Sequence, residues 1–419
     1  MTAMRQPPRA DGSDHRRPVG IDSIALALPR SYVDLADLAE ARGVAPAKFQ
    51  SGLGVNRMAI ASPDEDPVSL GVNAARRLFR RASVSPAEIG LCITGTETAV
   101  DHSKPVAAYL HGQLGLASAC RSFETKHACF GGTAGLLVAL DWVRSGSARG
   151  RSALVVCTDI ARYAVGSAGE PTQGAGAVAM IVRQDPRLLE IEAGESGSYT
   201  HDVHDFWRPL HAKDALVDGH FSVQCYLDAL AGAYDEWRRL PGAAREPLAR
   251  TCYHVPYGKM ARKAHRHRLG LDGLSEAEAD ATFAEQVGAS LELPAEVGNV
   301  YTGSLYLALA SLLHREASAI AGRRIGLFSY GSGCTAEFFA GRVHPEAAAM
   351  VAALQIDEPL QGRRRLTIDE YEAIRREDAS ADRRPAPETS GPSGAEIDKV
   401  ARFAGVDASY RRVYEHHGA

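Results

Sequence analysis

Residues 127–137 read HACFGGTAGLL: a single cysteine, Cys129, is followed by two glycines and then by a mostly apolar run that ends at Val143. Small residues at these positions are typical of a turn that opens a buried helix. The free peptide N–H groups at the start of a helix favour a thiolate, the nucleophilic form of cysteine, and leave donors for an oxyanion. Free cysteines are nevertheless more often buried packing residues. The interpretation therefore depends on what accompanies Cys129 elsewhere in the chain.

The composition is that of an ordinary globular protein of 419 residues, 45% hydrophobic and 23% charged. A net charge of -4 gives no reason to expect nucleic acid or an anionic membrane as a partner. No apolar run is long enough to cross a bilayer, and residues 1–18 lack the apolar core of a signal peptide. We therefore expect a cytoplasmic protein that binds neither nucleic acid nor membrane.

The cysteines are scattered and odd in number. They are Cys92, Cys120, Cys129, Cys157, Cys225, Cys252 and Cys334, and no CxxC pair occurs among them. This dispersed set predicts neither a zinc site nor a disulfide framework. We expect no metal ion and a reducing compartment.

Apolar periodicity alternates between strand and helix along the chain, which favours a layered α/β architecture. In the first part we expect strands at 21–28, 89–95, 153–157 and 175–182, and helices at 34–41, 66–82, 106–114 and 130–144. In the second part we expect helices at 225–238, 257–268 and 304–315, and strands at 252–255 and 324–329.

Two Gly-x-Gly turns close these two parts of the chain. Residues 174–181 read GAGAVAMI and residues 331–339 read GSGCTAEFF, and each turn leads into an expected strand. The pair suggests an internal duplication, with an N-terminal half at 19–185 and a C-terminal half at 186–419. Residues 1–18 are expected to form a disordered tail and 376–395, poor in apolar residues, a mobile surface loop.

Three further segments place polar side chains at strand ends or tight turns. Glu97 follows the strand at 89–95, where partial burial would raise a carboxyl pKa toward the range of a general base. His254 ends a short strand before a Pro/Gly turn, and Asn299 precedes a helix. Taken singly, these are more often a cap, a packing histidine and a turn residue. Together with Cys129 they are typical of acyl-transfer sites.

The ordered motifs of the chain resemble those of the 3-hydroxy-3-methylglutaryl-CoA (HMG-CoA) synthase family of the thiolase superfamily, from about Val19 to Tyr414. The matching blocks include GLGVNRM (52–58), GTETAVDHSK (95–104), HACFGGTAGLL (127–137), TDIARY (158–163), PTQGAGAVA (171–179), VDGHFSVQCYL (217–227), HVPYGK (254–259), GNVYTGS (298–304), SYGSG (329–333) and RFAGVDASYRRVY (402–414). The resemblance implies a thiolase-like fold, two duplicated halves in a five-layer αβαβα sandwich, and a homodimer.

The resemblance also implies roles for individual residues. Cys129 is expected to accept the acyl group, Glu97 to act as general acid and base, and His254 to orient and polarise the acceptor ketone. No cofactor is implied, because the substrates travel on a phosphopantetheine arm. The positions that the resemblance implies for substrate binding are Asp159, Asp205, Asn299, Tyr301, Ser332 and Gly333.

Within the family, the blocks at 206–209, 303–309 and 332–339 look most like enzymes that install β-branches on polyketides. This implies an acetyl-loaded donor carrier protein and a β-ketoacyl-loaded acceptor carrier protein as partners. Carrier proteins are acidic, so a basic helix at the site entrance would attract them. The candidate docking residues are Lys259, Arg262, Lys263 and Arg266, although a charged helix face is often only solvated.

Two alternatives stay open. One is a primary-metabolism HMG-CoA synthase that uses acetyl-CoA and acetoacetyl-CoA, and CoA phosphates would suit the same basic helix. The other is a ketoacyl synthase III-like enzyme, against which Glu97 argues because decarboxylation needs no carboxylate base. Phe130 and His127 depart from residues common in the CoA-dependent enzymes, Tyr and Asn respectively.

Overall fold

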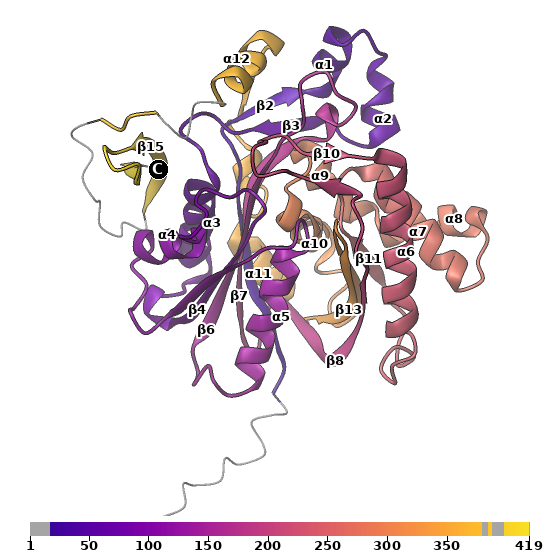
Figure 1. Ribbon diagram of the computed structural model, residues 1–419. Helices are drawn as coiled ribbons and strands as arrows, with labels where there is room; N and C mark the ends of the chain where they lie inside the picture. The colour runs from indigo at the N-terminus through magenta and orange to yellow at the C-terminus, as the bar shows by residue number, and fades with distance from the viewer. Residues whose placement is uncertain (1–16, 379–383, 388–397, 419) are drawn as a thin grey trace, which may run out of the picture.

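The computed structural model describes residues 17–378, 384–387 and 398–418. Within these residues one nine-stranded mixed sheet organises the molecule (Figure 1). Its strands are, in spatial order, β11 (Arg250–Tyr253), β12 (Arg324–Gly331), β13 (Thr335–Val343), β8 (Leu189–Thr200), β1 (Val19–Ala27), β7 (Gly174–Gln184), β6 (Ser152–Ala161), β4 (Ile89–Gly95) and β5 (Arg121–Thr125).

The sheet is a duplication with its seam between β1 and β8. In the N-terminal half β4 runs parallel to β6, and β6–β7–β1 are antiparallel neighbours. In the C-terminal half β11 runs parallel to β12, and β12–β13–β8 are antiparallel neighbours. Only two residue pairs, at Gly20 and Ile21 of β1, join the halves across the seam. The duplication expected from the two Gly-x-Gly turns is confirmed by this repeated order.

Helices complete a five-layer α/β sandwich of the thiolase type. Helix α3 (Pro67–Ala82) covers the outer face of the N-terminal sheet, and α6 (Gly219–Trp237) covers the outer face of the C-terminal sheet. Between the N-terminal and C-terminal halves of the sheet lie α5 (Gly131–Arg144) and α10 (Ser304–Glu316) (Figure 1). The Thr133 hydroxyl lies 2.7 Å from the Tyr306 hydroxyl, which links these two central helices.

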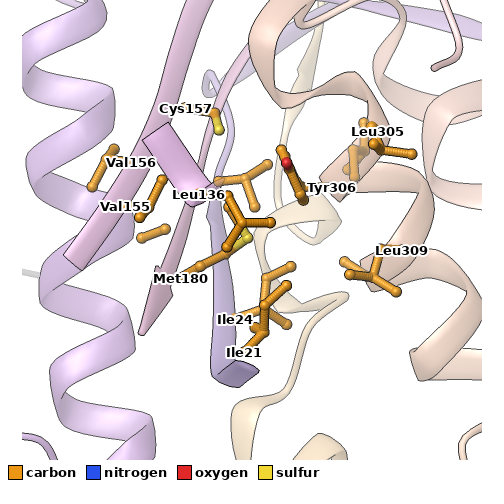
Figure 2. Packing of buried hydrophobic residues seen from close by; sticks show 14 of the residues in the cluster. Ile21, Ile24, Leu136, Val155, Val156, Cys157, Met180, Leu305, Tyr306 and Leu309 are labelled. Carbon is orange, nitrogen blue, oxygen red and sulfur yellow. The ribbon is translucent and has the colours of Figure 1, made fainter. Parts of the chain in front are cut away.

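Apolar side chains fill the space around the central helices. Figure 2 shows Leu136 of α5 among Val155 and Met180 of the N-terminal sheet, with Tyr306 and Leu309 of α10 facing it. All five of these side chains are buried. At roughly 1.5–3 kcal/mol for each large apolar side chain removed from water, this layer holds the two halves together.

Smaller elements cap the site end of the sandwich. Strands β2 (Ser31–Asp34), β3 (Arg57–Ile60) and β14 (Arg364–Arg365) form a three-stranded sheet. Around it lie α1 (Leu35–Ala41), α2 (Gln50–Leu53), α9 (Glu292–Val297) and α12 (Ile368–Asp378). Elsewhere lie α4 (Val106–Gln113), α7 (Gly258–Leu271), α8 (Glu276–Gln286), α11 (Ala347–Leu354), β9 (Phe206–Trp207), β10 (Leu216–Val217), β15 (Lys399–Val406) and β16 (Arg412–Gly418).

The ends of the chain differ in part from the expectation. Residues 376–378, assigned to a mobile loop, are the last residues of α12. Residues 384–387 of the same loop are also described, and there the Ala386 N–H donates to the Val406 carbonyl at 2.8 Å. The rest of the loop at 376–395 and tail residues 1–16 lie outside the described residues. Strand β15 packs back against α3 and pairs with β16.

Candidate active site

Cys129 lies in the tight turn between β5 and α5. The backbone of Ala128 has a φ of 38°, in the left-handed region, and the Phe130 N–H donates to the His127 carbonyl at 2.9 Å. Helix α5 begins two residues after the thiol, as the glycine-rich sequence predicts. Burial is the first cause that raises the pKa of Cys129 well above its ordinary value, and the nearby Glu97, Asp159 and Asp205 raise it further. The resting group is therefore a thiol, not the thiolate that the helix N-terminus would favour.

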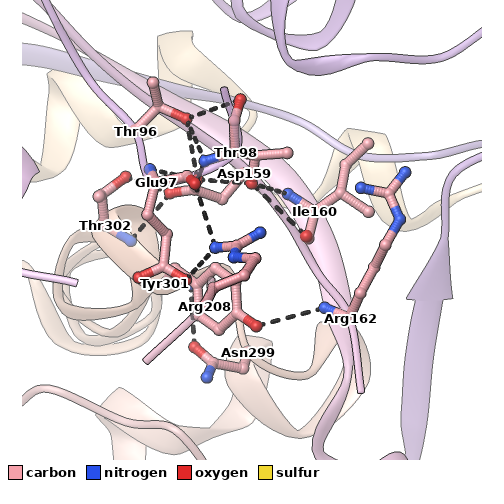
Figure 3. A network of polar contacts seen from close by, with 10 residues as sticks. All are labelled: Thr96, Glu97, Thr98, Asp159, Ile160, Arg162, Arg208, Asn299, Tyr301 and Thr302. Atoms are coloured by element: carbon pink, nitrogen blue, oxygen red, sulfur yellow. Dashed lines mark hydrogen bonds and ion pairs between the residues drawn. The ribbon is translucent and has the colours of Figure 1, made fainter. Parts of the chain in front are cut away.

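Glu97 follows β4 in a loop that a second carboxylate holds in place. Asp159 of β6 accepts the N–H of Glu97 at 2.9 Å and both the N–H and the hydroxyl of Thr98. Its other oxygen accepts the Thr302 hydroxyl and N–H from the turn before α10 (Figure 3). Asp159 is fully buried, and the hydrogen bonds found at its carboxylate come from the protein itself. Its visible role is to position Glu97, whereas substrate contact stays a prediction.

The carboxylate of Glu97 is buried and pairs with one cation. Its Oε1 accepts the Arg208 guanidinium at 2.6 Å, and its Oε2 is buried without a hydrogen-bond partner in the described part of the chain (Figure 3). Burial raises the pKa of Glu97 to about 8, although Arg208 counteracts part of this effect. The raised pKa confirms the expectation of a partly desolvated carboxyl, and it lies in the range of a general base at neutral pH.

His254 directly follows β11 and is buried. The backbone N–H of His254 donates to the Phe328 carbonyl at 2.7 Å, and the backbone carbonyl of His254 accepts the Tyr226 hydroxyl at 2.8 Å. Strand β12 then brings Gly331 against the nucleophile turn: a Cβ at Gly331 would lie 2.5 Å from the His127 carbonyl oxygen. Burial lowers the pKa of His254 to about 3, so the imidazole is neutral at working pH.

Asp205 connects the loop after β12 to the loop before β9. It accepts the Tyr330 hydroxyl at 2.7 Å, the Gly333 N–H at 3.0 Å and the Ser222 hydroxyl at 3.2 Å. Like Asp159, it is fully buried and bonded to the protein. Ser332 is the neighbour of Gly333 in this loop. Burial lowers the pKa of His127, and a hydrogen bond between His127 and the Ser332 backbone offsets part of that effect.

The segment before α10 forms another wall of the site. Asn299 accepts the Tyr301 N–H at 2.9 Å and the Ser304 hydroxyl at 2.7 Å, so its oxygen shapes the turn, as an ordinary turn asparagine would. The Tyr301 hydroxyl accepts the Arg162 N–H at 3.2 Å (Figure 3). Burial is the main cause that raises the pKa of Tyr301, and Glu97 and Cys129 add to it, so the phenol lies near both.

A cavity of about 520 Å³ reaches this centre from the surface. Glu97 and Ala128 line it on the side of the nucleophile turn, together with Arg208. Leu210, which is 89% exposed, and Lys213 line it farther out. The cavity thus opens beside Glu97 and the nucleophile turn, whereas Cys129 and His254 are not among the residues that line it.

The candidate docking residues of α7 divide into two kinds. Arg266 donates to both oxygens of Asp280 of α8 through Nε and Nη2, and Arg262 lies 3.6 Å from the same carboxylate. Their charges are therefore largely matched by α8. Lys259 is exposed and Lys263 half-buried, and within the described residues no ion pair joins either. Of the four candidate docking residues, Lys259 and Lys263 are therefore the two whose charges α8 does not match.

Arg208 and Tyr163 belong to the site, although the sequence interpretation assigned them no role. Arg208 follows Asp205 by three residues inside the block FWRP, a signal that was available. Burial mainly raises the pKa of Tyr163, and the proximity of Cys129 and Glu97 contributes. The seven cysteines are free thiols, and among the described residues no group of three His, Cys, Asp or Glu side chains is arranged to hold a metal ion. None of the described helices is both long and apolar enough to span a bilayer.

Two family models match the chain end to end. The model for the N-terminal part of hydroxymethylglutaryl-coenzyme A synthase matches residues 15–186, and the model for the C-terminal part matches 189–280 and 271–417. The chain belongs to the HMG-CoA synthase family. Family members are condensing acyltransferases, and the thiolase-like fold expected from the motifs is confirmed.

Relatives in this family include enzymes named for two kinds of substrate. The hydroxymethylglutaryl-CoA synthase of Enterococcus faecalis is 40% identical, over 85% of this chain and 91% of its own. The polyketide 3-hydroxy-3-methylglutaryl-ACP synthase PksG of Bacillus subtilis is 35% identical, over 85% and 87%.

Solved structures show the same two kinds. The structure of MvaS with 3-hydroxy-3-methylglutaryl coenzyme A has a TM-score of 0.89 and 46% identity, covering 96% of this chain and 100% of that one. The curacin-pathway HMG synthase with holo donor-ACP has a TM-score of 0.88 and 33% identity over the same shares. The fold is thus common to both, whereas the identities differ.

Proposed function

We propose that the protein joins an acetyl group on Cys129 to the β-ketone of a second thioester and then releases the product by hydrolysis. Cys129 displaces the donor thiol and becomes acetylated. Glu97 removes a proton from the acetyl methyl group, and the resulting enolate carbon attacks the ketone carbon. The ketone oxygen takes the proton that Glu97 removed. Water then cleaves the thioester bond to Cys129: its hydroxyl forms the new carboxyl group and its remaining proton returns to the sulfur, giving a β-hydroxy-β-carboxymethyl thioester.

The observation that carries this proposal is the buried Glu97 carboxyl near Cys129. Its pKa of about 8 makes the ionised carboxylate a stronger base than an ordinary glutamate, and its Oε2 has no hydrogen-bond partner in the described residues. A decarboxylating ketoacyl synthase would not need such a base, since loss of CO₂ supplies the enolate. This contrast favours the HMG synthase reaction over the ketoacyl synthase III-like alternative.

His254 is proposed to act on the acceptor ketone. With its pKa at about 3, the imidazole is neutral and carries one N–H that can donate a hydrogen bond to the ketone oxygen. A neutral donor in a buried site stabilises the developing alkoxide because little water competes there. We propose that the acyl groups near His254 contact Asn299, Tyr301, Ser332 and Gly333.

For the group that carries the substrates, we propose CoA thioesters as the first candidate. Two relatives named for CoA are 46% and 40% identical to this chain, above the 35% and 33% of two relatives named for polyketide pathways. Other hydroxymethylglutaryl-CoA synthases are 31–37% identical, so the preference rests on the first two. Lys259 and Lys263 carry free charges suited to the phosphates of CoA.

Carrier-protein substrates are the second candidate, and two observations favour them. The blocks at 332–339 and 303–309 look most like the polyketide enzymes. The cavity beside Glu97 also reaches exposed Leu210, which leaves room for an acyl chain longer than acetoacetyl. The positive charges of Lys259 and Lys263 suit an acidic carrier protein as well. A homodimer and a cytoplasmic location stay predictions in either case.

The test compares the two donors on one variant. Glu97→Ala should accept an acetyl group on Cys129 and keep it, because the base for the next step is missing. Mass spectrometry should show an adduct that Cys129→Ala lacks. Faster acetylation by acetyl-CoA than by acetyl-carrier protein would select the first candidate, and the reverse the second. No adduct with either donor would end the proposed mechanism.

A further inference from the structure

The two carboxylate oxygens of Glu97 have different surroundings. Oε1 accepts Nη2 of Arg208 at 2.6 Å, and the same nitrogen donates to the Glu97 backbone carbonyl at 3.1 Å. One guanidinium amino group thus holds both the side chain and the main chain of a single residue. Oε2 is buried and has no hydrogen-bond partner within the described residues.

Arg208 is itself held in place by the C-terminal half. It follows β9, which pairs with β10, and lies three residues after Asp205, which is bonded to Tyr330 and Gly333. Its guanidinium carbon lies 5.9 Å from the centre of the Tyr301 ring. Its side chain is 17% exposed, against 5% for Glu97. The ion pair therefore joins a base from one half of the fold to a cation from the other.

We propose that Arg208 is a positioning residue that fixes Oε1 of Glu97 and so leaves Oε2 to take the proton from the acetyl group on Cys129. The inference rests on the proposed function. In this step the methyl C–H bond breaks, its electron pair becomes the enolate, and the proton bonds to Oε2. Arg208 keeps its hydrogen bond to Oε1 throughout, so the carboxyl need not rotate.

The charges around Glu97 favour the same assignment. Arg208 and Lys126, which follows β5, lower the pKa of Glu97, whereas burial and Asp159 of β6 raise it. Cys129, Tyr163 and Tyr301 face the same centre. Without Arg208 the pKa of Glu97 would rise above about 8, and less of the carboxyl would be in its basic form at neutral pH.

The experiment compares Arg208→Gln and Arg208→Lys with the control Arg315→Gln. Arg315 forms an exposed pair with Glu292 at 2.8 Å, near the end of α10 far from Ser304, where that helix begins at the site. Acetylation of Cys129 is measured by mass spectrometry, and condensation by product formation from pH 6 to 10. Thermal unfolding shows whether each variant folds.

Arg208→Gln should acetylate at the wild-type level but condense about 100-fold more slowly, the usual scale for a misplaced catalytic group. Its rate should also rise at a higher pH than that of the wild type, and Arg208→Lys should recover part of both. Arg315→Gln should match the wild type.

Condensation by Arg208→Gln within about twofold of the wild type, with the same pH dependence, would overturn the inference. So would a folded Arg208→Gln that loses acetylation in step with condensation. If Arg208→Gln does not fold, unchanged rate and pH dependence in Arg208→Lys overturn it instead. A wild type that is never acetylated would instead count against the proposed function.

Discussion

Single residues in this site owe their properties to burial more than to their chemical type. The side chains of Glu97 and His254 are buried and Cys129 is half-buried, and burial is the first cause of each pKa change. Burial penalises the charged form, so the thiol and carboxyl pKa values rise and the imidazole pKa falls. At neutral pH the thiol and the imidazole are therefore uncharged, whereas the carboxyl of Glu97, with a pKa of about 8, is present in both protonated and ionised forms.

The state of Glu97 makes folding stability depend on pH. The pKa of Glu97 is raised from 4.5 to about 8 in the folded state, so between these pH values the folded chain holds a proton that the unfolded chain has lost. By linkage, this group lowers the free energy of unfolding as pH rises through that interval. Glu97→Gln removes the effect, so its melting temperature relative to the wild type should be higher at pH 8 than at pH 5. Thermal scans at both pH values test this, and an equal difference at both would contradict it.

The low pKa of His254, about 3, predicts a feature of the pH profile. The imidazole stays neutral from pH 5 to 9, so the condensation rate should show no step near pH 6.5 that belongs to it. His254→Ala should lower the rate about 100-fold by a similar factor at every pH in this range. Rate profiles of both proteins provide the check. A step near pH 6.5 that disappears in His254→Ala would refute the neutral donor.

At the scale of elements, strand ends and tight turns bring the chemistry together. Gly331 ends β12, and a Cβ there would lie 2.5 Å from the Phe130 nitrogen in the turn that carries Cys129. This close approach is why the Gly-x-Gly turn of the C-terminal half lies against the nucleophile of the N-terminal half. A displacement of Gly331 at the end of β12 would therefore also displace the turn that carries Cys129.

Gly331→Ala should therefore disturb the nucleophile turn while leaving the sheet intact. We expect acetylation of Cys129 to slow about 100-fold, because an added methyl group displaces the turn from its productive position. Gly219→Ala is the matched control, since nothing lies within 4 Å of a Cβ at that position in α6. Acetylation kinetics and circular dichroism are the measurements. Wild-type kinetics in Gly331→Ala would show that the turn tolerates the displacement.

At the scale of the whole molecule, the two halves meet along a short seam and a shared helical layer. A Cβ at Gly20 of β1 would lie 2.0 Å from the Leu189 carbonyl oxygen of β8. The central helices α5 and α10 join the halves a second time through Thr133 and Tyr306. The active site therefore exists only when both halves are docked.

Gly20→Ala should destabilise the whole protein, because the added methyl group has to push the neighbouring strands β1 and β8 apart. We expect a loss of about 3 kcal/mol in the free energy of unfolding, the upper part of the range for overpacking. Gly112→Ala in α4, where a Cβ meets nothing within 4 Å, should match or exceed the wild type. Urea unfolding followed by fluorescence measures both. A Gly20→Ala protein as stable as the wild type would mean that the seam is not tightly packed.

The sequence by itself determined the elements and the duplication, and it supplied the candidate reactive groups, whose roles stay predictions. Apolar periodicity and glycine positions are local, so β4, α3 and α10 are found within a few residues of their expected bounds. The motif around Cys129 and the Glu97 block similarly depend on neighbours in the chain.

Only the tertiary structure decided what surrounds those groups. The Arg208 pair with Glu97 joins residues 111 positions apart, and Asp159 supports a loop that begins 63 residues earlier at Thr96. Likewise, the neutral thiol of Cys129 and the matched charges of Arg262 and Arg266 depend on carboxylates that other elements supply. Electrostatic interactions and burial depend on distance in space, which periodicity along a chain does not encode.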